Sequence, residues 1–335
     1  MTCSDSQVHI PQHTPSWIRL ALAAVCVAAL AGVLAVGRLR PDAESLAGRP
    51  TGTRRNAACR ECHPAVGDEW QRSFHSKSWS DPNVQAAFEH FGHDRKCESC
   101  HAPQSVFQTG LTNEVALRNE ERESGVDCLS CHELADGRVA ARRTLPDAPC
   151  RPLATPELAG SQACAPCHVA IYDDWQQSAY ARSGKTCQSC HQPAVAQRAG
   201  GASHLYPGGH DDAWVRSGAE MSCRQQGAEL IVQVRNHATG HNYPGERHNR
   251  VLLVQVIQRQ TDGTITLAQQ AVIKDITPFR GESSADRIRP GEVFQAVFPV
   301  VDPPVAAEVQ LLYKRFPWHR DEEALTVHRQ LLELQ

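Results

Sequence analysis

The sequence predicts two unlike regions behind an N-terminal transmembrane helix: short helices and loops packed on covalently bound cofactors, followed by an antiparallel β-sandwich. Three observations predict this fold class. Cysteine pairs followed by histidine recur between residues 59 and 191. Alternating apolar residues, separated by Pro and Gly, dominate the chain after residue 216. Residues 20–37 form an uncharged and largely apolar run.

The apolar run at residues 20–37 is long enough to cross a bilayer, at the short end of the usual range. We therefore expect an uncleaved membrane anchor, with residues 1–19 in the cytoplasm and residues 38–55 as a linker. A cleaved signal peptide is the alternative, although its apolar region is usually shorter, about 7 to 15 residues.

The motif Cys-x-x-Cys-His occurs five times, and this motif attaches c-type haem. Its two thiols bond to the porphyrin, and the adjacent imidazole ligates the iron. Zinc is the competing interpretation of paired cysteines, but every Cys-x-x-Cys in this chain is followed by His, which favours haem. The attachment residues are Cys59, Cys62, Cys97, Cys100, Cys128, Cys131, Cys164, Cys167, Cys187 and Cys190. The proximal ligands are His63, His101, His132, His168 and His191.

Five covalently bound haem c groups would define a pentahaem cytochrome domain at residues 56–215. Only 6% of the 335 residues are aromatic, so we expect porphyrins to supply much of its core. Covalent haem attachment takes place outside the cytoplasmic membrane, which predicts haem and β domains on the periplasmic side of a bacterial cytoplasmic membrane. The two arginines that follow residue 37 weakly favour the opposite orientation. A formal net charge of −3 gives no case for nucleic-acid binding.

An internal duplication with an offset of 105 residues runs through this domain. The matched residues are Trp70 and Trp175, Ser73 and Ser178, His75 and Tyr180, and Ser78 and Ser183. We interpret them as one unit used twice, around a middle site at Cys128. The differing position is the most informative, because His75 is a natural iron ligand whereas Tyr180 is expected to pack.

Several strings in this region resemble multihaem cytochromes of the cytochrome c554 type. They are Trp-x-x-Ser-x-His at residues 70–75, Cys-Glu-Ser-Cys-His-Ala-Pro at 97–103, Gly-Val-Asp-Cys-Leu-Ser-Cys-His at 125–132, and the related strings at 175–180, 184–191 and 203–210. The resemblance implies electron transfer and does not identify a substrate. It also implies that a histidine shortly after the last motif serves as a remote ligand.

The supply of remote ligands decides what each iron can do. Of 17 histidines, five are proximal, and His9 and His13 lie before the anchor. We predict His75, His204, His210 and His241 as remote ligands, with the fifth supplied by His93 or His90. His237, His248, His319 and His328 are expected in solvated loops. Two imidazoles per iron suit electron relay, whereas a missing one would leave an iron open to a small ligand.

The chain after residue 216 predicts an antiparallel β-sandwich over residues 216–320. Alternating apolar residues mark strands at 230–234, 252–256, 264–273, 294–298 and 309–313, with an Asp262-Gly263 turn before the third. Residues 321–335 are expected to close as a short helix. Cys150 and Cys223 could form a disulfide or remain two buried thiols.

The function predicted from these patterns is electron relay by a membrane-anchored periplasmic pentahaem cytochrome c. Its expected partners are redox proteins, either other cytochromes or a quinol-linked complex, and the inner membrane through residues 20–37. Two alternatives stay open. One is an oxidoreductase with an open haem that acts on a small nitrogen compound, and the other is a quinol-oxidising subunit. An electron-transfer protein is favoured over a substrate-converting enzyme.

Overall fold

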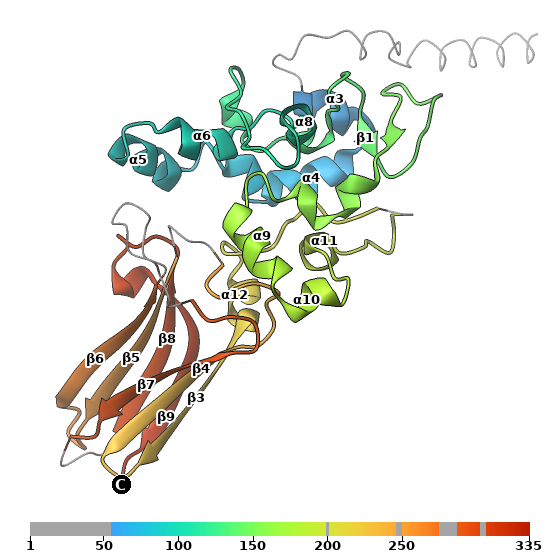
Figure 1. The fold of residues 1–335 in the computed structure, drawn as a ribbon. Helices are drawn as coiled ribbons and strands as arrows, with labels where there is room; N and C mark the ends of the chain where they lie inside the picture. Colours follow the sequence, from blue (N-terminus) through green and yellow to red (C-terminus); the bar gives the residue numbers. More distant parts are fainter. Residues whose placement is uncertain (1–54, 199–200, 246–249, 275–286, 302–305) are drawn as a thin grey trace, which may run out of the picture. The chain divides into compact units, whose positions relative to one another are not determined.

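The computed structural model describes residues 55–198, 201–245, 250–274, 287–301 and 306–335. Figure 1 shows short helices in the first part of the chain and two sheets in the second. The expected membrane segment, residues 20–37, lies outside the described ranges. Within those ranges, no helix is both long enough and apolar enough to cross a membrane.

Short helices and loops make up the first part, in agreement with the sequence. The α-helices are α3 (Arg55–Cys62), α4 (Pro64–Arg72), α5 (Pro82–His90), α6 (Arg95–His101), α7 (Val106–Thr109), α8 (Cys128–His132), α9 (Val169–Gln176), α10 (Ala179–Arg182), α11 (Cys187–His191) and α12 (Asp212–Gly218). The 3-10 helices are η1 (His75–Lys77), η2 (Arg122–Ser124), η3 (Pro156–Ala159) and η4 (Ser161–Ala163). β1 (Ala140–Ala141) and β2 (Leu153–Ala154) form a short parallel pair.

Two of these helices, α8 and α11, consist of a Cys-x-x-Cys-His motif alone. Each begins after a capping residue, Asp127 or Thr186, whose side chain accepts a hydrogen bond from a backbone N–H three residues later. The side chain at that third position, Ser130 or Ser189, bonds back to the backbone of the cap. This capping box satisfies N–H groups at the helix start. Five residues are too few for a stable isolated helix, so caps and packing hold the motif in place.

Two antiparallel sheets form the second part, and one apolar core lies between them. The first sheet has the order β3 (Ala219–Gln226), β4 (Glu229–Asn236), β7 (Val293–Pro299). The second has the order β6 (Ile265–Lys274), β5 (Val251–Arg259), β8 (Ala306–Lys314), β9 (Leu325–Glu333). Fully buried core residues come from both sheets: Leu230, Val232, Val234, Val254, Val256, Val309 and Leu311. The five predicted strands are confirmed, because their alternating apolar residues face this core.

The predicted turn at Asp262 and Gly263 is also confirmed, between β5 and β6. Gly263 has a φ of +86°, which glycine adopts without steric cost. The Asp262 side chain accepts a hydrogen bond from the Thr264 N–H at 2.8 Å. This turn joins two strands that pair antiparallel along their length.

The expected C-terminal helix at residues 321–335 is wrong. A 3-10 turn, η6 (Asp321–Glu323), precedes β9, which pairs with β8. Val327 is buried whereas Leu331 is 69% exposed, so the leucine spacing does not mark a buried helix face. The β-branched Thr326 and Val327 favour a strand, and pairing with β8 decides the outcome.

β3 was not predicted, because its sequence AEMSCRQQ contains few large apolar residues. It pairs with β4 in register, with Cys223 opposite Val232. Cys223 is a free thiol, and burial raises its pKa to about 11. The disulfide between Cys150 and Cys223, which the sequence left open, is therefore not formed.

Candidate haem sites

The duplication in the sequence is a duplication of structure. The indole of Trp70 donates to the Val126 carbonyl at 2.8 Å, and the indole of Trp175 donates to the Lys185 carbonyl at 3.0 Å. Each carbonyl lies two residues before a motif cysteine, Cys128 or Cys187. In each copy, the tryptophan that follows one motif therefore holds the start of a later motif in place. Trp70 does this for the Cys128 motif, and Trp175 for the Cys187 motif.

The same correspondence appears at the cysteines. The backbone N–H of Cys128 donates to Asn56, and that of Cys187 donates to Ser161, each at 3.0 Å. Asn56 and Ser161 are 105 residues apart, like the two tryptophans. The side chains of Cys128 and Cys59 are neighbours, and so are those of Cys164 and Cys187. Each copy thus contains a pair of motifs.

This pairing corrects the predicted middle site. The motif at Cys128 belongs to the first copy, because it occupies the place that the motif at Cys187 occupies in the second. The additional site is the one at Cys97 and Cys100. The side chains of Cys100 and Cys167 are neighbours, so this site adjoins the second copy. Sequence spacing alone could not show it, because the two copies differ in the distance between their motifs.

Three pairs of imidazole rings lie at the spacing that a single metal ion between them requires. The ring centres are 6.3 Å apart for His132 and His204, 6.3 Å for His75 and His168, and 6.4 Å for His191 and His241. A metal–nitrogen bond of about 2.0–2.1 Å plus about 1.1 Å to the ring centre, counted on both sides, gives about 6.3 Å. One member of each pair belongs to a motif, and the other is a predicted remote ligand. These residues fit a haem iron, and ligation itself stays a prediction.

Hydrogen bonds at Nδ1 orient four of these six rings. His132 and His191 donate to the carbonyls of Ala140 and Pro207 at 2.8 Å and 2.6 Å. The remote rings do the same: His204 bonds to Ala202 and His241 to Asn242, each at 2.9 Å. A carbonyl accepts only from a protonated nitrogen, so Nε2 carries the lone pair that a metal needs.

Burial lowers the pKa of five of these six imidazoles and so favours their neutral form. It lowers the pKa of His75 to about 3, with a further contribution from the neighbouring His168. Burial also lowers the pKa values of His132, His191, His204 and His241, in each case as the largest cause. Neutral imidazole is the form that ligates iron, so the electrostatics of the sites fit their predicted role.

The structure does not bring His210 or His93 to a motif imidazole within the described residues. The His210 ring stacks on Phe74 at 3.4 Å, and its Nε2 lies 3.0 Å from the Arg250 guanidinium. His93 is more than half exposed and is bonded to Glu98 at 2.9 Å. The alternative to His93, His90, contacts Phe91.

Two proximal histidines lie outside the three imidazole pairs. His63 is exposed, and His101 bonds through Nδ1 to the Ser78 carbonyl at 2.6 Å. His248 lies outside the described residues.

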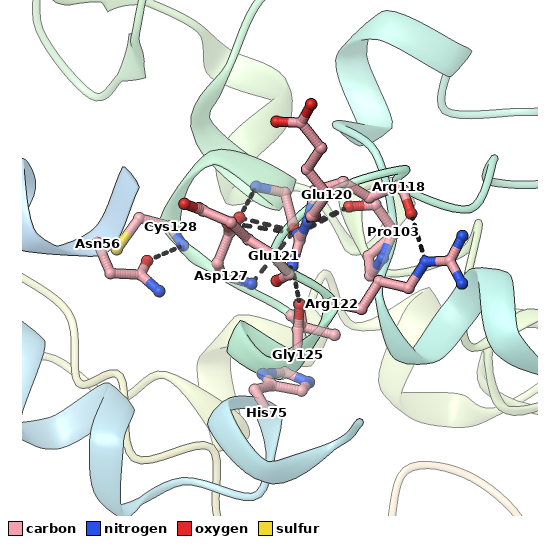
Figure 2. A network of polar contacts seen from close by, with 12 residues as sticks. Asn56, His75, Pro103, Arg118, Glu120, Glu121, Arg122, Gly125, Asp127 and Cys128 are labelled. Atoms are coloured by element: carbon pink, nitrogen blue, oxygen red, sulfur yellow. Dashed lines mark hydrogen bonds and ion pairs between the residues drawn. The ribbon is translucent and has the colours of Figure 1, made fainter. Parts of the chain in front are cut away.

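A buried ionic network under the Cys128 motif was missed by sequence reasoning (Figure 2). Arg118 and Asp127 are 5% and 2% exposed and form an ion pair at 3.3 Å. Arg118 also donates to the carbonyls of Glu121 and Gly125 at 2.7 Å and 3.0 Å. Because Asp127 also caps α8, the network holds the loop that delivers this motif. The one sequence feature that could have indicated this network is the position of Asp127 directly before a motif, where an aspartate caps a helix.

The β-sandwich presents His241 to the haem region through a second buried ion pair. Asp174 of α9 pairs with Arg287 at 2.5 Å and accepts from the Asn242 side chain at 3.0 Å. Asn236, which is fully buried at the end of β4, donates to the His241 carbonyl at 2.9 Å. The turn that carries His241 is thus tied both to its own sheet and to the helix after the fourth motif.

Comparison with known proteins agrees with this geometry. Residues 58–133, which contain the first three motifs, match the family described as cytochrome c554 and c-prime. The fold is similar to that of a penta-heme cytochrome c552 from Thermochromatium tepidum, with a TM-score of 0.61. The two share 17% sequence identity, and the match covers 84% of this chain and 98% of that one. No curated protein matches this chain.

Two further solved structures match the chain in part. The chicken interferon gamma receptor alpha chain matches at 14% identity, over 35% of this chain and 50% of its own, with a TM-score of 0.22. A Bacteroides uniformis beta-glucuronidase matches at 16% identity, over 34% of this chain and 12% of its own, with a TM-score of 0.19. Both similarities are too weak to support a conclusion. The family match over residues 58–133 and the similar fold support the prediction of a multihaem c-type cytochrome.

Proposed function

We propose that this chain is a multihaem c-type cytochrome that binds five haem c groups and relays electrons between redox partners on the periplasmic side of the membrane. The observation that carries the proposal is the set of three imidazole pairs at 6.3–6.4 Å. Haem iron held between two imidazoles changes charge with little change in geometry, which suits electron transfer. The protein supplies binding, orientation and a low-dielectric environment.

The arrangement of the attachment cysteines supports a relay. The attachment cysteines lie close together across motifs: Cys59 beside Cys128, Cys164 beside Cys187 and Cys100 beside Cys167. His75, in the first copy, lies beside His168 of the second copy. Each motif thus has at least one other motif as a neighbour. Close spacing of redox sites is what transfer through the protein requires.

The count of five and the membrane anchor are parts of the proposal with separate tests. Intact-mass analysis of the mature protein should show five added haems, and a mass that corresponds to fewer would contradict the count. The same spectrum reports whether residues 1–37 are retained, as an anchor requires. Fractionation of cells that produce the full chain should place it in the membrane. Recovery in the soluble periplasmic fraction would contradict anchoring.

Redox proteins are the proposed partners, and the membrane is reached through residues 20–37. Two propionates per haem would add about ten negative charges to the formal −3 of the chain, so we expect basic docking surfaces on the partners. Electron transfer to such a partner should slow as ionic strength rises. A rate that does not depend on salt would contradict electrostatic docking.

The oxidised-state spectrum tests relay against catalysis. Low-spin ferric signals are expected from the three imidazole pairs. A high-spin ferric signal beside them would favour an oxidoreductase that binds a small nitrogen compound at open iron, and a wholly low-spin spectrum would exclude it. Quinol-dependent reduction that disappears on removal of residues 1–40 would favour a quinol-oxidising subunit.

A further inference from the structure

We propose that Tyr206 is a positioning residue that sets the ring orientations of two remote ligands, His75 and His204, at two different haem sites. The inference rests on the proposed function, because it assigns those histidines to irons. It goes further by identifying one side chain that couples the two sites.

The Tyr206 ring contacts both imidazoles directly. Its centre lies 4.5 Å from that of His75, with the planes at 58°, and 5.7 Å from that of His204, at 82°. Aromatic rings favour such tilted and edge-to-face contacts at these distances. His75 is paired with His168 and His204 with His132, so the phenol ring lies between ligands of sites in separate copies of the repeat. Rotation of either imidazole would require Tyr206 to move.

The tyrosine is itself fixed at both ends. Its hydroxyl accepts a hydrogen bond from the Gln192 side chain at 2.8 Å. Its backbone has a φ of +46°, an unusual left-handed conformation for a residue with a bulky side chain. Such a conformation persists only where the surroundings determine it. Here, the next carbonyl, that of Pro207, accepts the Nδ1 hydrogen bond of His191 at 2.6 Å.

The segment that carries Tyr206 is anchored to the first copy of the repeat. Glu69 of α4 accepts from the His204 backbone N–H at 2.9 Å and from the Arg198 guanidinium at 2.7 Å. This ion pair is mostly buried. The ring of Tyr206 therefore has a fixed position relative to α4, α11 and η1, the elements that carry or adjoin the ligands.

Ring orientation has a measurable consequence that packing alone lacks. In a low-spin ferric haem with two imidazole ligands, the g-values depend on the angle between the ligand planes. Groups around the ligands also tune reduction potential. If Tyr206 sets two ring planes, its loss should shift two low-spin signals together and leave the third unchanged. A purely structural tyrosine would lower stability without this selectivity.

The test uses the holoprotein, four tyrosine variants and two histidine variants. Tyr206→Phe removes the hydroxyl but keeps the ring, and it should leave the low-spin signals in place. Tyr206→Asn removes the ring at a position where asparagine tolerates the backbone, and Tyr206→Leu fills the space without a planar ring. Tyr180→Asn is the matched control, because Tyr180 packs beside Gly240 and contacts neither His75 nor His204. His204→Ala and His241→Ala assign the signals to sites.

Electron paramagnetic resonance of the oxidised variants, with haem content from intact mass, gives the result. Two shifted signals in Tyr206→Asn and Tyr206→Leu, with the His241 site and both other variants unchanged, are expected. Unshifted signals in variants that hold five haems would overturn the inference. So would failure of both ring-removing variants to assemble, since that shows a structural role. Absence of low-spin signals from the unmodified protein would instead overturn the proposed function.

Discussion

His241, on a turn of the β-sandwich, lies with its ring centre 6.4 Å from that of His191, the proximal residue of the last motif, and within 15° of parallel. Both rings bond through Nδ1 to backbone carbonyls. The β domain thus does more than shield the haem region from solvent, because it supplies the imidazole that faces His191 of the last motif.

Replacement of His241 by alanine should convert one low-spin centre to a high-spin one. The reason is that the Cys187 site would lose its remote ligand while its proximal His191 remains. Electron paramagnetic resonance of the oxidised protein measures the change. His237→Ala is the control, since His237 is half exposed and pairs with Glu220 at 3.1 Å. An unchanged low-spin count in His241→Ala would contradict the assignment.

Replacement of Asp127 by alanine should destabilise the haem region by about 3–5 kcal/mol, because it leaves the buried Arg118 charge uncompensated. It also removes the cap of α8. Asp81→Ala is the matched control: Asp81 caps α5, and loss of such a cap costs about 1 kcal/mol. Denaturant unfolding of the two variants gives the comparison. Equal losses would show that the ion pair contributes little.

Acid should weaken the contact between α4 and the segment around His204. Hydrogen bonding from Arg198 lowers the pKa of Glu69 below its ordinary value of 4.5. A carboxyl group whose pKa is lower in the folded state stabilises that state above the unfolded pKa. This stabilisation is lost as pH falls from 4.5 through the folded value. Unfolding measured between neutral pH and pH 3 should therefore show a smaller loss in Glu69→Gln. An identical pH profile would exclude a role for Glu69.

Replacement of His210 by alanine should leave the low-spin signals unchanged. The structure stacks His210 on Phe74 and bonds it to Arg250, away from the motif imidazoles in the described residues. The expected effect is lower stability where the haem region meets the sheet that contains β5. Spectra and thermal unfolding of the variant separate the two roles. Appearance of a high-spin signal would restore the original prediction that His210 is a ligand.

What the sequence predicted well depends on local chemistry. The spacing within each Cys-x-x-Cys-His motif is a property of five consecutive residues, and strand alternation is a property of about five to nine. His75, His204 and His241 were chosen as remote ligands because motif neighbours and turn residues marked them. The structure places each of them next to a different motif imidazole.

What it missed depends on contacts between distant segments. Nothing near His210 in the sequence shows that the Arg250 guanidinium will lie within hydrogen-bond distance of its Nε2. The residues LTVHRQLLE of β9 have leucines at helical spacing, and only pairing with β8 makes them a strand. The pairing of Cys59 with Cys128 was hidden in the same way, because the intervening Cys97 motif has no counterpart in the second copy.

The most direct test of the account is the electron paramagnetic resonance spectrum of the oxidised, haem-loaded full chain. At least three low-spin ferric centres are expected, one for each imidazole pair. Each of the substitutions His75→Ala, His204→Ala and His241→Ala should convert one of these centres to high spin. A spectrum without low-spin centres, or one that these three substitutions leave unchanged, would contradict the assignment of the imidazole pairs to haem iron.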